Sequence, residues 1–196
     1  MNPQLHHALY GPQSLNPQLF LAINHAHHPL LDPVMEAMIY LGGSRSVYLY
    51  AAILLCVSLV RREWVPLRYV WVFCLATAVG IGLEEWLKAL FHLPRPPLAI
   101  GLDQVRVLGE VKLKNSFPSG HAVFVFVTAV TLSWRRGLGW KVPLYSFALL
   151  VAYSRAYVGA HYPLDVAAGA VIGAAAGVLV WKGYELLTRR RHRPTV

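Results

Sequence analysis

Two histidines and an aspartate are the residues of this chain whose types and spacing fit a chemical role. His161 comes just before Pro163, which suits the first position of a helix, and Asp165 falls in the first turn of that helix. From there Asp165 can reach back to one ring nitrogen of His161, which fixes the tautomer and leaves the other nitrogen free to attack. Taken alone, His161 can equally be an interfacial histidine and Asp165 a favourable first-turn charge.

The second histidine, His121, follows Pro118, Ser119 and Gly120 at the expected start of an apolar helix. Backbone N–H groups at a helix start favour an anion such as phosphate, and Ser119 and Gly120 can supply further hydrogen bonds to it. A histidine at this point can carry a proton to or from the bound group. Ser-Gly before a helix is also ordinary capping chemistry, so the meaning of this stretch depends on the other motifs.

Three cations, Lys88, Arg95 and Arg155, are the third component. Lys88 and Arg95 are seven positions apart, so on a continuous helix they would share one face. The pair can also be cations that snorkel at a membrane end. Together, however, three cations and two histidines suit a dianionic phosphoryl group, because arginine binds phosphate in a bidentate manner. Glu84 and Glu85, one turn before Lys88, are expected to pair with it, although such acids can also mark a functional site within the membrane.

The composition indicates a membrane protein. Of 196 residues, 56% are hydrophobic and only 14% charged, whereas an ordinary soluble domain has about 25% charged residues. The net charge of +9 falls in short clusters between apolar runs, which fits membrane topology better than nucleic-acid binding, so no nucleic-acid partner is expected. Cys56 and Cys74 lie within apolar runs and show neither a disulfide framework nor metal spacing.

The expected fold is an all-α, polytopic membrane helix bundle that forms a single domain over residues 1–196. Residues 1–17 are expected to be an irregular arm, 18–41 amphipathic helices on the membrane surface, 46–188 the helical bundle and 189–196 a basic cytoplasmic tail. About five spanning helices are expected, at 47–60, 69–91, 117–134, 142–158 and 163–187. A sixth span within 18–41 stays open, although its histidines, acids and prolines argue against a lipid-embedded helix.

Basic residues set the expected orientation of this five-span arrangement. On one side lie Arg61, Arg62, Arg68, Arg135, Arg136, Lys141, Lys182, Arg189, Arg190, Arg191 and Arg193, and on the other Arg45, Lys88, Arg95, Arg106, Lys112, Lys114 and Arg155. The richer side should be cytoplasmic. The candidate site residues would then gather at the opposite, non-cytoplasmic surface, where the helix ends meet.

The three motifs together resemble the signature of the type 2 phosphatidic acid phosphatase family. The matching stretches are Lys88-x6-Arg95-Pro96, Pro118-Ser119-Gly120-His121 and Ser154-Arg155-x5-His161-x3-Asp165. The resemblance implies that the histidine at 161 attacks phosphorus to form a phosphohistidine, that Asp165 orients it, and that His121 protonates the leaving oxygen and then activates water. It also implies a phosphate-binding set made of Lys88, Arg95, Ser119, Gly120 and Arg155, with no metal and no other cofactor.

The function expected from the motifs is hydrolysis of a lipid phosphate by an integral membrane phosphatase of the cell membrane. Undecaprenyl diphosphate is the first candidate substrate, since the compact chain resembles bacterial undecaprenyl diphosphate phosphatases; phosphatidylglycerol phosphate and phosphatidic acid are the alternatives. A non-catalytic protein that binds or moves a phosphorylated lipid is the alternative of another class, but binding alone does not need His161 with Asp165. The His25, His27 and His28 cluster has no partner motif, so a metal site is not expected there.

Overall fold

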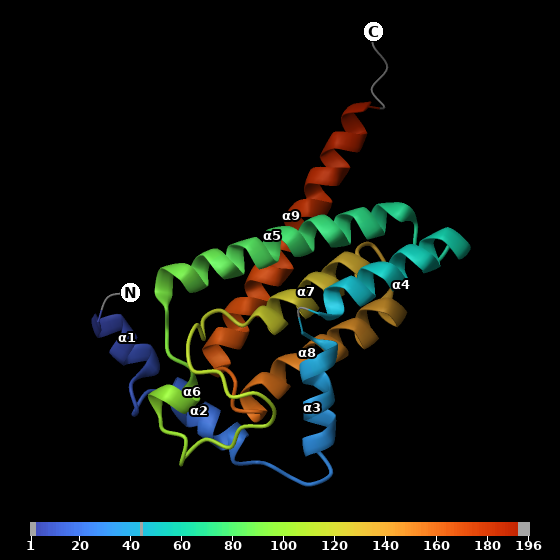
Figure 1. The fold of residues 1–196 in the computed structure, drawn as a ribbon. Coiled ribbons are helices and arrows are strands. Elements are labelled where there is room, and N and C mark those ends of the chain that lie inside the picture. Colours follow the sequence, from blue (N-terminus) through green and yellow to red (C-terminus); the bar gives the residue numbers. More distant parts are fainter. Residues whose placement is uncertain (1–2, 44, 192–196) are drawn as a thin grey trace.

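A computed structural model describes residues 3–43 and 45–191, and its regular secondary structure is helical throughout (Figure 1). The predicted all-α class is therefore confirmed. The helices are α1 (Pro3–Tyr10), α2 (Leu15–Asn24), α3 (Asp32–Leu41), α4 (Ser46–Val60), α5 (Leu67–Phe91), α6 (Pro96–Ala99), α7 (Gly120–Ser133), α8 (Leu138–Tyr157) and α9 (Pro163–Arg191). Residues 100–119 form a long loop that carries no helix and closes one end of the bundle.

Helix α7 is the centre of the bundle, packed among α5, α8 and α9 (Figure 1). Its side chains are buried almost without interruption from Ala122 to Ser133, which explains why it reads as apolar on all faces. Small residues on α9 allow the close packing: a Cβ atom at Gly169 or Gly173 would collide with the backbone carbonyl of Ser119 or Val123. This close contact places the start of α7 directly against the start of α9.

Helix α5 has one face in the core and one apolar face on the outside. Phe73 and Ala76 are fully buried, whereas Trp71, Leu75 and Trp86 are exposed. A wide exposed apolar face on a long helix is typical of contact with lipid. By length and composition, two segments of the described residues can cross a membrane, Leu67–Ala99 and Pro163–Arg189.

The remaining helices depart from simple spans. Helices α3 and α4 meet the same test only as a pair, and they are bent by 70° against each other, as in a broken span or a re-entrant loop. Helix α7 is apolar but short. The described chain thus contains two or three candidate spans by this test, so the five-span arrangement stays a prediction.

The N-terminal segment corrects the expectation of an irregular arm. Residues 3–10 form α1, and α2 starts at Leu15, within the stretch expected to be irregular. Two of the three prolines of this segment lie at helix starts: Pro3 begins α1, and Pro17 is in the first turn of α2, where its missing N–H leaves no bond unmade. At the other end, Arg189–Arg191 continue α9, and residues 192–196 of the expected tail lie outside the described residues.

Candidate active site

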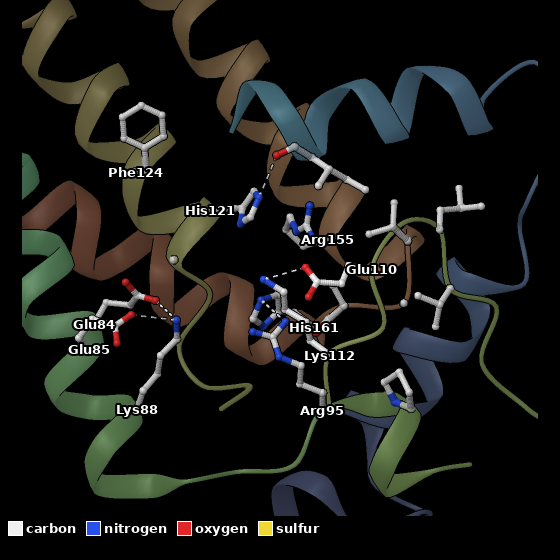
Figure 2. A pocket seen from close by; sticks show the side chains of 18 of the residues that line it. Glu84, Glu85, Lys88, Arg95, Glu110, Lys112, His121, Phe124, Arg155 and His161 are labelled. Carbon is white, nitrogen blue, oxygen red and sulfur yellow. Dashed lines mark hydrogen bonds and ion pairs between the residues drawn. The ribbon is translucent and has the colours of Figure 1, made fainter. Parts of the chain in front are cut away.

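The three sequence motifs meet at one end of the bundle, around a cavity of about 340 Å³. The lining comes from the C-terminal part of α5, the start of α7, the end of α8 and the link before α9, together with Ile39 of α3, Pro97 of α6 and the 100–119 loop. Figure 2 shows the side chains of Lys88, Arg95, His121, Arg155 and His161 converging on this cavity. The volume lies in the range of small-ligand pockets, about 300–1,000 Å³.

His161 is held between two hydrogen-bond partners that define its tautomer. Nη1 of Arg95 lies 3.1 Å from Nε2, and the carbonyl oxygen of Ser116 lies 2.7 Å from Nδ1. A guanidinium only donates and a carbonyl only accepts. Nδ1 therefore carries the proton and donates it to Ser116, while Nε2 keeps its lone pair on the side of Arg95.

The environment also keeps His161 neutral. The residue as a whole is 2% exposed. Burial, and then the positive charges of Arg95, Arg155 and Lys88, lower the pKa of His161 well below its ordinary value of 6.5. At neutral pH the imidazole is therefore uncharged, so the Nε2 lone pair is available for nucleophilic attack.

Asp165 lies close to His161 but not where the sequence predicted. Its Oδ2 atom is 3.8 Å from Nδ1 of His161, which is beyond hydrogen-bond distance. The carboxylate instead accepts hydrogen bonds from the Ser116 hydroxyl at 2.6 Å, the Tyr10 hydroxyl at 2.7 Å and the Tyr162 N–H at 3.0 Å. The expected direct hydrogen bond that fixes the tautomer is therefore wrong, and the Ser116 carbonyl takes that place.

Arg95 has nearly all of its guanidinium N–H groups in hydrogen bonds within the protein. It lies beyond the end of α5, since the helix ends at Phe91, so the predicted shared helix face with Lys88 is also wrong. Its guanidinium donates to the carbonyls of Lys114, Ala160 and Asn115 as well as to His161. These bonds use four of the five N–H groups of the side chain and tie the 100–119 loop to the link before α9.

Arg155, unlike Arg95, has guanidinium nitrogens without a hydrogen-bond partner in the described part of the chain. Its side chain is 4% exposed on α8, and neither Nε nor Nη1 has a hydrogen-bond partner among the described residues. Buried guanidinium donors without a protein acceptor are costly. Because Arg155 lines the cavity, an anion bound there would supply the missing acceptors.

Lys88 is paired with carboxylates at the edge of the same cavity. Its Nζ atom contacts Glu84 Oε1 and lies 3.4 Å from Glu85 Oε1, which confirms the predicted pairing (Figure 2). Glu84 is buried beside Gly120, where an added Cβ atom would lie 2.5 Å from Glu84 Oε1. Glycine at position 120 therefore leaves the room that the Glu84 carboxylate occupies.

His121 and Ser119 differ in their access to the cavity. His121 lines it, and its Nε2 lies 3.1 Å from the carbonyl oxygen of Ile39 on α3. Ser119 is fully buried at the N-cap of α7, is not among the lining residues, and its Oγ has no partner in the described part of the chain. The Ser119 N–H donates to the Asp165 carbonyl at 3.0 Å, which couples the starts of α7 and α9.

Sequence reasoning missed three residues that support the site: Ser116, Asn24 and Tyr10. Asn24, fully buried on α2, donates to the carbonyls of Arg106 and Tyr157, both at 2.8 Å. Ser116 could have been noticed from its place beside the Phe117–His121 motif, whereas nothing local marks Asn24 or Tyr10.

Within the described residues, no group of three or more His, Cys, Asp or Glu side chains has an arrangement that could hold a metal ion.

Comparison with known proteins identifies the class to which this site belongs. The family model described as "PAP2 superfamily" matches residues 69–189, which contain all three motifs. The chain therefore belongs to the PAP2 superfamily, and it is a membrane lipid phosphatase, a hydrolase, as the motifs predicted.

Two curated relatives and one solved structure of this family are similar to the chain over most of their length. The undecaprenyl-diphosphatase BcrC of Bacillus subtilis is 28% identical over 88% of this chain and 86% of its own length. The lipid A 4'-phosphatase of Bacteroides thetaiotaomicron is 32% identical over 92% of this chain and 82% of its own. The crystal structure of Aquifex aeolicus LpxE superposes with a TM-score of 0.76 at 37% identity, covering 86% of this chain and 96% of that one.

Proposed function

We propose that this phosphatase hydrolyses undecaprenyl diphosphate at the non-cytoplasmic face of the cell membrane through a phosphohistidine at His161. The observation that carries the proposal is the neutral, buried His161 beside Arg155, whose Nε and Nη1 have no hydrogen-bond partner among the described residues. The similarity to BcrC, an undecaprenyl-diphosphatase, over most of both chains supports the choice of substrate. A cavity of about 340 Å³ suits a phosphorylated head group, while the polyprenyl tail would stay in the bilayer.

In the proposed reaction, Nε2 of His161 attacks the terminal phosphorus. The bond from that phosphorus to the bridging oxygen breaks, and the lipid monophosphate leaves as the phosphohistidine forms. The proton on Nδ1 stays on the Ser116 carbonyl side, so the imidazole develops its positive charge against that acceptor. Water then attacks the phosphohistidine and releases inorganic phosphate, which restores neutral His161.

His121 is the proposed proton carrier. Because the Ile39 carbonyl accepts the proton on Nε2 of His121, Nδ1 is the nitrogen that exchanges a proton with the reacting groups. With both ring nitrogens protonated, His121 would give its Nδ1 proton to the bridging oxygen as that oxygen leaves, and Nδ1 would then take a proton back from the attacking water.

The cations have different proposed roles. Arg155, Lys88 and the Gly120 N–H bind the non-bridging oxygens, and Arg155 supplies two donors that lack partners within the described protein. Arg95 donates to the lone pair of the nucleophile, so that N–H must pass to a phosphoryl oxygen as Nε2 attacks. Ser119 is proposed to act on phosphate only indirectly, by fixing the start of α7, because its hydroxyl lies behind the cavity lining.

The test is phosphate release by the purified protein in detergent from a panel of lipids: undecaprenyl diphosphate, a lipid A phosphate, phosphatidylglycerol phosphate and phosphatidic acid. We expect the highest kcat/KM with undecaprenyl diphosphate, full activity in EDTA and inhibition by vanadate. His161→Ala should lose turnover while its thermal unfolding stays close to that of the wild type. A preference for another lipid would overturn the substrate, and turnover that survives His161→Ala would overturn the mechanism.

We also propose the five-span arrangement, with the cavity open to the non-cytoplasmic side. The bias of basic residues towards the other side supports it. The test replaces Cys56 and Cys74 with alanine and introduces Gln104→Cys in the exposed part of the 100–119 loop. A membrane-impermeant thiol reagent should label this cysteine from outside intact cells, and labelling only after the cytoplasmic side is opened would contradict the orientation.

A further inference from the structure

Helix α1 contacts the candidate active site through the side chain of Tyr10, which binds Asp165 behind His161. The Tyr10 hydroxyl donates a 2.7 Å hydrogen bond to Oδ1 of Asp165, across 155 positions of sequence. Asp165 is fully buried. A residue from the segment expected to be an irregular arm is therefore part of the hydrogen-bond shell of the buried carboxylate.

That carboxylate is connected to His161 through Ser116. The Ser116 hydroxyl donates to Oδ2 of Asp165 at 2.6 Å, and the Ser116 carbonyl accepts the Nδ1 proton of His161 at 2.7 Å. One residue thus binds the carboxylate with its side chain and the imidazole with its backbone. A change in the position or charge distribution of Asp165 is transmitted to the ring through Ser116.

The orientation of Tyr10 is fixed by aromatic packing. Its ring meets the ring of Tyr162 edge to face at 5.3 Å, and Tyr162 meets Phe20 in the same manner at 5.3 Å. Burial, and then the charge of Asp165, raise the pKa of Tyr10 far above its ordinary value of 10. The hydroxyl therefore remains a donor at every pH at which the enzyme can work.

We propose that Tyr10 is a positioning residue for the phosphatase reaction, acting on His161 through Asp165 and Ser116. It touches neither substrate nor reacting atoms. By donating to Oδ1, it holds the carboxylate where Ser116 can bind Oδ2, and it takes up part of the carboxylate charge that would otherwise act on the imidazole. The proposal rests on the proposed function of His161 as the nucleophile.

Several charged or titratable groups besides Asp165 face His161, and they set the electrostatic background against which Tyr10 acts. They come from α5, the α5–α6 link, α7 and α8: Lys88, Arg95, His121 and Arg155. All of them remain in a Tyr10 variant. A shift in the pH dependence of that variant therefore reports on the Tyr10–Asp165 contact.

The decisive variant is Tyr10→Phe, which removes the hydroxyl and keeps the ring packing. Because a hydrogen bond to a charged group is lost, we expect kcat to fall about 10-fold with KM almost unchanged. We also expect the acidic limb of the kcat/KM profile to move to higher pH. A carboxylate that lacks one donor either stabilises the His161 imidazolium more strongly or takes up a proton itself, and both changes remove activity at higher pH than in the wild type.

The matched control is Tyr69→Phe. The Tyr69 hydroxyl also donates a partly buried hydrogen bond, at 2.9 Å to the carbonyl of Trp134 in the link between α7 and α8. Its loss should affect thermal unfolding by a similar amount without moving kcat or the pH profile. Ser116→Ala removes the next hydroxyl of the network, so the double variant Tyr10→Phe/Ser116→Ala should lose less than the product of the two single effects.

The outcomes separate this proposal from the proposed function. If wild-type turnover depends on His161 but Tyr10→Phe keeps the wild-type kcat and pH profile, the positioning role of Tyr10 is wrong and the nucleophile stands. If Tyr10→Phe and Tyr69→Phe lower activity equally, with no change in the pH profile, Tyr10 acts only on stability and the proposal is again wrong. If His161→Ala keeps wild-type turnover, the proposed function itself fails.

Discussion

The two buried arginines of the cavity have the same chemistry but opposite surroundings. Arg95 donates to three backbone carbonyls and to His161, whereas Nε and Nη1 of Arg155 have no partner among the described residues. Both residues are buried, Arg95 with 8% and Arg155 with 4% of its surface exposed. The comparison indicates that one arginine is part of the protein's own hydrogen-bond framework, and that the other is prepared for a partner from outside it.

This difference indicates that the Arg95 side and the Arg155 side of the site have different roles. The Arg95 side ties the 100–119 loop to the link before α9 and donates to the lone pair of His161, so that the proposed nucleophile is held in place before substrate binds. The Arg155 side keeps a buried charge whose Nε and Nη1 have no partner among the described residues, which destabilises the fold; the proposed phosphate binding would offset that cost. The three cations of the sequence motifs are therefore not equivalent. Arg95 holds parts of the protein together, whereas Arg155 is proposed to bind the phosphoryl group.

The largest expected effect is that of Arg95→Ala, which should damage both stability and catalysis. The change leaves three carbonyl acceptors unpaired, so the free energy of unfolding should fall by about 3 kcal/mol or more. Thermal unfolding in detergent and kcat measured on the same sample check this. Arg95→Lys is the matched control, because it keeps the charge but not the fork, and it should recover only part of the loss. Wild-type stability in Arg95→Ala would contradict the scaffold role.

Arg155→Ala should separate binding from stability. Removing a buried cation with unpaired donors should leave the unfolding temperature unchanged or higher, while kcat/KM should fall roughly 10³-fold, as expected for loss of an arginine that stabilises a transferring phosphoryl group. Vanadate should also no longer raise the unfolding temperature, as it should in the wild type. A destabilised Arg155→Ala protein that still responds to vanadate would reverse the roles of the two arginines.

These differences also show how far the sequence leads. The motif residues Lys88, His121, Arg155 and His161 were placed correctly around one cavity because their chemistry and spacing are local properties of helix ends. The Tyr10–Asp165 contact could not be predicted, since it joins residues 155 positions apart and no local pattern marks either partner for the other.

The fold shows the same limit. The ends of α5 and the start of α9 follow from prolines and apolar runs, and α5 and α9 were found nearly where predicted. Helix α1 was not predicted, because residues 1–17 are largely polar and contain three prolines, although Pro3 occupies a helix start. The role of the Ser116 carbonyl in binding His161 was missed because a backbone acceptor carries no residue-type signal.

The pH dependence provides a smaller test of the same comparison. Because burial and nearby cations lower the pKa of His161 below 6.5, the acidic limb of kcat/KM that belongs to this residue should lie below pH 6.5. The sign for stability follows: the unfolded chain takes up a proton near pH 6.5 that buried His161 resists, so the stability contribution is present above that pH and is lost as pH falls below it. In Arg155→Ala the limb should move to higher pH, since one of the depressing charges is gone. An unchanged limb would show that Arg155 does not act on His161.

The smallest expected effect is that of Glu84→Gln. Glu84 contacts Lys88 and lies beside Gly120, so its charge competes with a phosphoryl group for Lys88. Neutralising it should lower KM about 2- to 5-fold, the range of a weakened ion pair, with little change in kcat. Glu85→Gln is the control, because that side chain is exposed at the edge of the cavity. A rise in KM for Glu84→Gln would indicate that the Glu84–Lys88 pair helps to bind substrate.

The most direct test of the central claim is to trap the covalent intermediate. The protein would be mixed rapidly with undecaprenyl diphosphate labelled at the terminal phosphate, denatured in alkali, where phosphohistidine survives, and digested for peptide mapping. We predict label on the peptide that contains His161 in the wild type, and none in His161→Ala. Label that persists in His161→Ala, or that maps to the His121 peptide, would contradict the account.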